Sequence, residues 1–159
     1  HLVSRVFTEA FNHGRLEVID DAVGENAIDH QHPDVPSFAE HLKAVVTAMR
    51  AAFPDLHFEL TEIIGEGEWV AVHSVMTGTN TGELRQPLLP PDAPETLPPT
   101  GRTVRVAHMH MIRFENGRNT ELLHVMDTMA MLGQLGLGPG SDRTPAATRK
   151  VGDRAAAAT

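Results

Sequence analysis

Residues 102–126, RTVRVAHMHMIRFENGRNTELLHVM, contain two apolar stretches separated by the triplet Glu115-Asn116-Gly117. The alternation of apolar and polar side chains predicts one strand over Arg102–Phe114 and a second over Arg118–Met126. An Asn-Gly pair between two such stretches is a strong hairpin signal, because both residues accept the positive φ angles of a tight turn. The stretch therefore predicts two long antiparallel strands joined by a hairpin turn.

Three histidines lie on one face of this predicted hairpin. Strand parity puts His108 and His110 on the same side, and the turn brings His124 of the second strand beside them. Each imidazole carries two ring nitrogens that need partners, so three rings on an apolar face favour the wall of a pocket. The alternative is that each ring is a hydrogen-bonded residue of the interior. The apolar residues that share this face are Val106, Ile112, Phe114, Leu122 and Met126.

The rest of the chain places helices before strands. Apolar spacing and stop signals predict helices over Leu2–His13, Leu16–Val23, Ser37–Phe53 and Thr128–Leu135, a short strand or loop over Ala27–His32, and long strands over Leu56–Gly65 and Glu68–Thr79. Ser37 and Glu40 form a capping-box pattern at the start of the third helix. Helices followed by an antiparallel sheet predict an α+β fold and not an alternating βαβ one.

At 159 residues the chain is long enough for one domain. We assign residues 1–137 to that domain. Gln86–Thr100 contains six prolines and is expected to be an ordered lid or loop between strands. Residues 138–159, rich in Ala, Thr, Gly and Pro, are expected to form a tail that is flexible or draped on the domain.

The composition excludes several classes of partner. Thirteen Lys and Arg against 21 Asp and Glu give a net charge of −8, which argues against nucleic acid, because phosphate binding needs clustered cations. No apolar run is long enough to span a bilayer, so no membrane association is expected. The absence of Cys excludes disulfides and thiol catalysis and is compatible with the cytoplasm, where we expect the protein.

A metal site is the first alternative for the histidines. His108 and His110 with Glu115 imitate a His-x-His…Glu ligand set, and neutral imidazoles do bind zinc or iron. Glu115, however, belongs to the hairpin turn, where its side chain is expected to face solvent. We therefore expect no metal and no other cofactor.

Two further polar positions keep two interpretations each. Asp127 fits the N-cap of the last helix, or its carboxylate could orient His124. His30, in the run His30-Gln31-His32, could lie at the surface or at the mouth of the pocket.

An ordered set of short motifs resembles the SnoaL-like polyketide cyclase (ester cyclase) family of the nuclear transport factor 2-like superfamily. The resemblance covers Leu2 to Gly136 and rests on Ala52-Phe53-Pro54-Asp55-Leu56, Trp69-Val70-Ala71-Val72, Met76 through Glu83, Pro98-Pro99-Thr100-Gly101-Arg102, Arg113 through Arg118, and Asp127 through Gly136. It implies a cone-shaped fold, in which a curved antiparallel sheet wraps around three helices and encloses one internal pocket. It also implies cofactor-free cyclases that close polyketide rings by aldol chemistry in secondary metabolism, whereas relatives of the same fold isomerise, dehydrate, hydrolyse or only bind ligands.

Aligned on Gly117 and Gly136, the family places its pocket histidine at His110 and its general-base aspartate at His124. The second position is a departure, although an imidazole can act as a base near neutral pH. The resemblance thus implies catalytic roles for His124 and His110. The candidate substrate-binding residues are His108, His30, Met49, Phe53, Met76, Met126 and Asp127.

The expected function is cyclisation or isomerisation of an apolar, carbonyl-bearing metabolite, of polyketide type, by a lyase or isomerase that uses histidine for proton transfer. A non-catalytic binding or carrier domain, and a hydrolase or dehydratase, are the alternatives. The convex face of the sheet, with Ala71, His73 and Val75 or their alternates outward, is expected to be apolar enough to form a homodimer.

Overall fold

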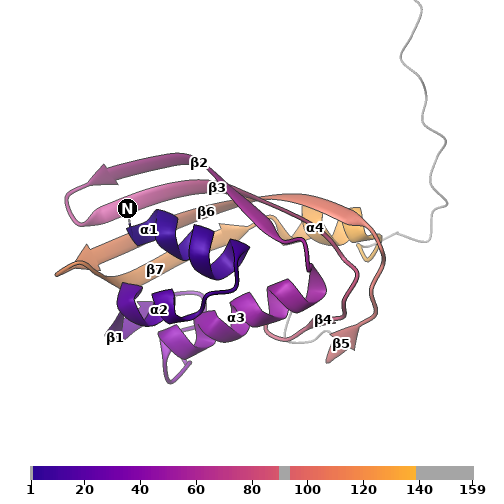
Figure 1. Cartoon of the computed structure of the whole chain (residues 1–159), viewed down its shortest axis with the longest axis horizontal. Helices are drawn as coiled ribbons and strands as arrows, with labels where there is room; N and C mark the ends of the chain where they lie inside the picture. Colours follow the sequence, from indigo (N-terminus) through magenta and orange to yellow (C-terminus); the bar gives the residue numbers. More distant parts are fainter. Residues whose placement is uncertain (1, 90–93, 139–159) are drawn as a thin grey trace, which may run out of the picture.

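The protein is described here by a computed structural model that covers residues 2–89 and 94–138 (Figure 1). The helices are α1 (Leu2–Arg5), η1 (Val6–Asn12), α2 (Glu17–Ala22), α3 (Phe38–Ala52) and α4 (Thr128–Leu135). The strands are β1 (Val23–Asp29), β2 (His57–Glu66), β3 (Trp69–Thr79), β4 (Leu84–Arg85), β5 (Thr96–Leu97), β6 (Thr103–Glu115) and β7 (Arg118–Met126). The α+β class predicted from the sequence is confirmed.

The main sheet has five strands in the order β1-β7-β6-β3-β2. Each neighbouring pair of the four long strands is antiparallel, as predicted. The fifth strand, β1, pairs in parallel with β7, with Asp29 opposite Leu122. The sequence left this segment as a short strand or loop, because a parallel partner distant in the chain leaves no local signal.

The hairpin between β6 and β7 turns at Asn116 and Gly117, whose φ angles are 51° and 76°. Both angles are positive, as a turn of this kind requires. The register shifts by one residue between Arg113 and Phe114, and beyond this irregularity His110 lies directly opposite His124 and His108 opposite Met126. All three histidines therefore lie on one face, as predicted, but the turn alone would have put His124 on the other face.

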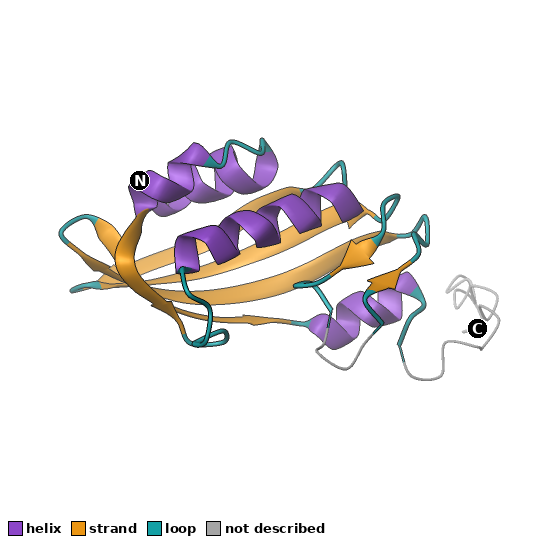
Figure 2. Cartoon of the chain, turned by 90° about the horizontal axis from the view of Figure 1, so that it is seen from below, coloured by secondary structure: helices purple, strands orange, loops and turns teal. Residues whose placement is uncertain are grey.

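The helices α1, η1, α2 and α3 lie together on the concave face of the sheet (Figures 1 and 2). Ser37 caps α3 by accepting a hydrogen bond from the backbone N of Glu40 at 3.4 Å, which confirms the predicted cap. The buried residues of α3 face the sheet, and they are Phe38, Val46, Met49 and Ala52. The predicted single N-terminal helix is divided, since Val6–Asn12 winds as a π-helix that no feature of the sequence signals.

Helix α4 continues the sheet where β7 ends. Asp127 caps it, its carboxylate accepting from the backbone N of Ala130 at 2.9 Å. The Gln134 side chain then pairs with the free edge of β6, accepting from Arg105 N at 2.7 Å and donating to Arg105 O at 3.0 Å. The helix thus replaces the strand that β6 lacks beyond Met126.

The segment after β3 folds back over the end of α3. Asn80 is fully buried and ties this segment to the helix, donating to Ala52 O at 3.3 Å and accepting from Thr100 N at 2.8 Å. At Gly82 an added Cβ would lie only 1.9 Å from Ala51 O, so this approach requires glycine. The described parts of the predicted lid are therefore ordered, with β4 and β5 paired as a small second sheet.

The predicted tail falls largely outside the description, since residues 139–159 are not among the described ones. The expectation that it is flexible or draped on the domain is therefore neither confirmed nor contradicted. None of the described helices is long and apolar enough to cross a membrane.

Candidate active site

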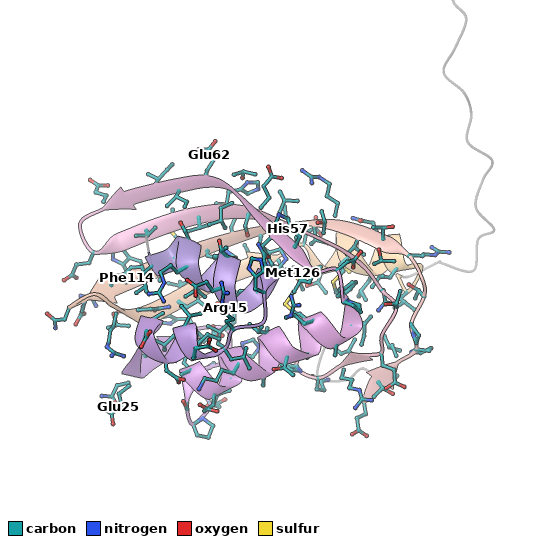
Figure 3. All side chains as sticks on the ribbon, viewed as in Figure 1. Arg15, Glu25, His57, Glu62, Phe114 and Met126 are labelled. Atoms are coloured by element: carbon teal, nitrogen blue, oxygen red, sulfur yellow. The ribbon has the colours of Figure 1, made fainter. Side chains whose placement is uncertain are left out.

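A pocket of about 530 Å³ lies between the concave face of the sheet and the helices. Its walls are mostly apolar and include Phe114 of β6 and Met126 of β7, both labelled in Figure 3. Leu84, Leu88 and Leu89 of the folded-back segment close one side. The polar side chains that reach the pocket are few, and they are Asp29, Gln31, His32, His41, His108, His110, Asn119, His124 and Thr128.

Five imidazole rings form a continuous row along this pocket. The ring centroids of His108 and His110 are 5.9 Å apart, and those of His110 and His124 are 6.0 Å apart, both pairs stacked. His32, after β1, stacks on His124 at 6.1 Å, and His41 of α3 lies 4.5 Å beyond it. The row joins two strands, one loop and one helix across an otherwise apolar wall.

Asp29 is the carboxylate at the centre of this row. It ends β1, is only 3% exposed, and places Oδ2 2.9 Å from His32 Nδ1 and 3.5 Å from His124 Nε2. Burial alone raises the pKa of Asp29, but hydrogen bonds from His124, from His32 and from the backbone N of Gln31 outweigh it. The pKa of the carboxyl therefore lies well below its ordinary value, and Asp29 is ionised at neutral pH.

Gln31 holds the two sides of this cluster in register. Its backbone N donates to Asp29 Oδ1 at 3.0 Å, and its side-chain Oε1 accepts from the backbone N of His124 at 2.8 Å. One residue thus fixes the carboxylate and the strand that carries the histidine.

Burial keeps His108 and His110 neutral. The pKa of His108 is lowered to about 4 and that of His110 to about 3. Burial is the main cause of both shifts, and the neighbouring imidazoles contribute in the same direction. Aromatic rings hold both in place, with Phe58 edge-on to His108 at 5.1 Å and Phe7 edge-on to His110 at 5.3 Å. His108 Nε2 and His110 Nδ1 are buried and have no hydrogen-bond partner among the described residues.

Six of the nine candidate residues from the sequence line the pocket. These are His108, His110 and His124, together with Met49, Phe53 and Met126. The three histidines share one face, as the sequence predicted, and the register shift between Arg113 and Phe114 pairs His110 with His124.

The other three candidates lie elsewhere. Met76 is fully buried in the core and does not line the pocket. His30 lies away from the pocket and pairs with Glu121 at 3.0 Å, because it points to the opposite side of the chain from Asp29. Asp127 is occupied with capping α4, so the carboxylate beside His124 is Asp29 and not Asp127.

Sequence reasoning missed Asp29, Gln31, His32 and His41 as site residues. His41 was not among the candidates, but it lines the pocket, its Nε2 is buried, and burial lowers its pKa. A signal was present, since His41 falls within the apolar helical spacing of Phe38 and Val45. His32 belonged to the run His30-Gln31-His32 that was weighed for the pocket mouth, whereas no signal marked Asp29, because its place depends on the parallel pairing of β1 with β7.

The metal ligand set weighed in the sequence is not assembled. Glu115 pairs with Arg113 at 3.1 Å on the surface, away from His108 and His110. Within residues 2–89 and 94–138, a different group could hold an ion: ligand atoms of Asp29, His32 and His124 all lie within 4.8 Å of one another.

A bent sheet that wraps around helices and encloses a pocket defines the cone-shaped, nuclear transport factor 2-like class of domain. The chain belongs to the SnoaL-like polyketide cyclase family, whose family model matches residues 1–135. No curated protein matches the sequence.

Solved structures agree with this assignment. TsrD from Streptomyces laurentii superimposes with a TM-score of 0.73 at 20% identity, over 86% of this chain and 92% of that one. Wild-type IdmH from Streptomyces antibioticus, described as a candidate polyketide cyclase, superimposes with a TM-score of 0.67 at 27% identity. The match covers 85% of this chain and 96% of IdmH. AclR from Streptomyces galilaeus, described as a candidate hydroxylase, superimposes with a TM-score of 0.70 at 25% identity. The match covers 87% of this chain and 84% of AclR.

Proposed function

We propose that this protein is a cofactor-free, polyketide-cyclase-like enzyme that cyclises or isomerises an apolar, carbonyl-bearing metabolite by histidine-mediated proton transfer. The observation that carries the proposal is the cross-strand pairing of His110 and His124 on one wall of the pocket, with the ionised Asp29 beside His124. Family membership supports a cyclase, but the fold alone does not choose the reaction.

His124 is the proposed general base. Its Nε2 faces Asp29 Oδ2, so the carboxylate favours the tautomer that carries hydrogen on Nε2 and leaves the lone pair on Nδ1. When Nδ1 takes a proton, the resulting imidazolium lies beside an anion that is already in position. A carboxylate that fixes the tautomer and stabilises the charged ring is the division of labour seen in other His–Asp pairs.

His110 is the proposed donor to the developing enolate. A ring with a pKa of about 3 is neutral at pH 7 and carries a single N–H. Because its Nδ1 is buried without a partner, we place that hydrogen on Nε2, where a substrate oxygen can accept it. A preorganised donor at the position where negative charge develops lowers the barrier most.

The proposed reaction needs no reagent other than the substrate, because the proton that is removed is later returned. His124 Nδ1 removes a proton from the carbon beside a carbonyl, and the C–H electron pair becomes the enolate. The enolate carbon then attacks a second carbonyl carbon of the same molecule and forms the ring bond. The resulting alkoxide recovers the proton from the His124 imidazolium, so the enzyme returns to its starting state. In an isomerisation the same proton is returned to another carbon.

The pocket supports an apolar substrate with a small number of oxygen functions. About 530 Å³ accommodates a fused-ring molecule, and most of the wall is Leu, Val, Met and Phe. The candidate polyketide cyclase IdmH has 27% identity with this chain, which favours a substrate of polyketide type.

Deuterium exchange tests the first step without knowledge of the substrate. In D₂O, the wild-type protein should catalyse exchange at the carbon beside the carbonyl of 1-tetralone, an apolar bicyclic ketone, followed by NMR. His124→Ala should lose about 10²–10⁴-fold in this rate, since that is the usual contribution of a general base. His30→Ala, which removes a neighbouring imidazole outside the pocket, is the matched control and should keep the wild-type rate.

Binding measured in parallel separates the alternatives. If 1-tetralone binds and the wild-type protein adds nothing to the background exchange, the carrier alternative replaces this proposal. If His124→Ala weakens binding and exchange by the same factor, His124 shapes the pocket and is not the base.

A further inference from the structure

We propose that Asp29, His32 and His124 form a binding site for a divalent first-row transition-metal ion, and that metal bound there withdraws His124 from proton transfer. The metal part of this inference stands independently of the proposed function, whereas the inhibitory part rests on it. The three residues come from β1, the loop after it and β7, and all three line the pocket.

The distances fit a compact coordination sphere. Asp29 Oδ2 lies 2.9 Å from His32 Nδ1 and 3.5 Å from His124 Nε2, and the three ligand atoms lie within 4.8 Å of one another. Bonds of about 2.0–2.1 Å in a tetrahedral zinc site place neighbouring ligand atoms about 3.3 Å apart. The two oxygen–nitrogen distances lie on either side of that value, and the two imidazole nitrogens lie within 4.8 Å of each other, so rotation of the rings can bring the three atoms around one ion.

Surrounding contacts already orient the ligands. Asp29 uses Oδ1 to accept from the backbone N of Gln31, which leaves Oδ2 directed at both imidazoles. Gln31 also fixes the backbone of His124, and His41 packs against the His32 ring at 4.5 Å. Partners of this kind, which hold the ligands and do not touch the ion, are typical of metal sites.

The ligand types define the class of ion. Two imidazole nitrogens with one carboxylate oxygen suit zinc, iron(II) or cobalt(II), whereas magnesium and calcium prefer oxygen ligands throughout. Three protein ligands leave a coordination position open, as in catalytic zinc sites. Because all three residues line the pocket, that position is available to water or to a substrate oxygen.

Metal binding and base catalysis exclude each other at His124. A metal on Nε2 displaces the hydrogen that Asp29 holds there, so the neutral ring must carry its hydrogen on Nδ1. The lone pair assigned to proton abstraction is then lost. A bound ion should therefore suppress the deuterium exchange of 1-tetralone, although the apolar part of the pocket is unchanged.

The binding test uses protein without an affinity tag, in the absence of any ketone. Titration with Zn²⁺ by calorimetry should show one ion per chain, and Co²⁺ should give visible absorption bands of a low-symmetry nitrogen–oxygen site. His32→Ala should weaken Zn²⁺ binding by more than about tenfold, the smallest loss usual for residues that only support a metal ligand. His30→Ala removes an exposed imidazole two residues away and should bind like wild type.

Several outcomes would overturn the proposal. Absence of a saturable one-to-one Zn²⁺ complex in the wild-type protein would do so. Equal losses in His32→Ala and His30→Ala would assign the ion to surface histidines. His124→Ala serves as the second ligand variant if His32→Ala does not fold, and it too must lose Zn²⁺ binding.

The two proposals fail separately. If Zn²⁺ binds and the metal-free protein does not exchange 1-tetralone, the metal site stands and the proposed function falls. If exchange occurs and Zn²⁺ does not bind, the reverse holds. If Zn²⁺ saturates the site and exchange continues at the metal-free rate, the inference that the ion withdraws His124 from catalysis is wrong.

Discussion

The Nε2 atom of His124 lies 3.5 Å from Oδ2 of Asp29, and this contact joins the C-terminal half of β7 to the last residue of β1. The carboxylate is almost fully buried and the histidine faces the pocket, so the pair has one protected side and one side open to a ligand.

Asp29→Asn should reduce the rate of 1-tetralone exchange by about 10²-fold or more, because an amide neither fixes the His124 tautomer nor stabilises its imidazolium. Binding of the ketone should change little, since Asp29 contributes to charge and not to the apolar wall. NMR exchange rates and calorimetric binding check both parts. A loss confined to affinity would contradict the assigned role.

His124→Asp introduces the aspartate that the resemblance implies for the base position, yet it should be nearly inactive alone. The new carboxylate would lie close to the ionised Asp29, and two like charges at short range raise the pKa of one of them. The double variant Asp29→Asn/His124→Asp removes this repulsion and should exchange 1-tetralone faster than His124→Asp. Equal rates in the single and double variants would contradict a coupling between the two positions.

The stability of the fold should decrease as the pH falls from about 6.5 toward 4, the interval between the ordinary pKa of histidine and the value for His108. In this interval His108 and His110 are protonated in the unfolded chain but stay neutral in the folded protein. The unfolded state therefore binds more protons, and acid favours unfolding. The pKa of His41 is also lowered by burial, so this residue contributes to the pH dependence with the same sign. Urea denaturation at pH 7 and pH 5 measures the effect, and His110→Gln should make the two free energies of unfolding more similar.

A homodimer should form through the convex face of the sheet. Met109 and Met111 of β6 are 45% and 46% exposed, and Leu123 of β7 is 39% exposed, so these strands present an apolar surface to solvent. Light scattering at micromolar concentration should give twice the chain mass. The variant Met109→Lys/Met111→Lys should be monomeric, whereas Met129→Lys, on the exposed side of α4, should remain dimeric.

Local patterns predicted the fold and half of the site. The Asn116-Gly117 turn indicated the hairpin, although the pairing of His110 with His124 also needs the register shift between Arg113 and Phe114, and Ser37 and Asp127 cap the helices that their positions indicated. Each of these features depends on residues that are neighbours in sequence or joined by one short turn. Strand parity alone assigned the correct face to His108.

The other half of the site depends on contacts that no local pattern encodes. Gln31 and His124 are 93 residues apart, and only the parallel pairing of β1 with β7 brings them together. The sequence instead left Asp127, three residues from His124, as one possible partner beside its role as a helix cap. His41 was recoverable, because helical periodicity places it on the apolar face of α3.

The parallel pairing of β1 with β7 also constrains the order in which the molecule can be assembled. A nascent chain completes β1 early, but β7, with which β1 pairs in the described part of the chain, is synthesised after all the other strands of the main sheet. Until β7 arrives, β1 and one edge of β6 have unpaired backbone groups, which are the groups through which partly folded chains associate. The contact between His124 and Asp29 and the protection from aggregation are therefore acquired in the same late step, and truncation before Arg118 would abolish both.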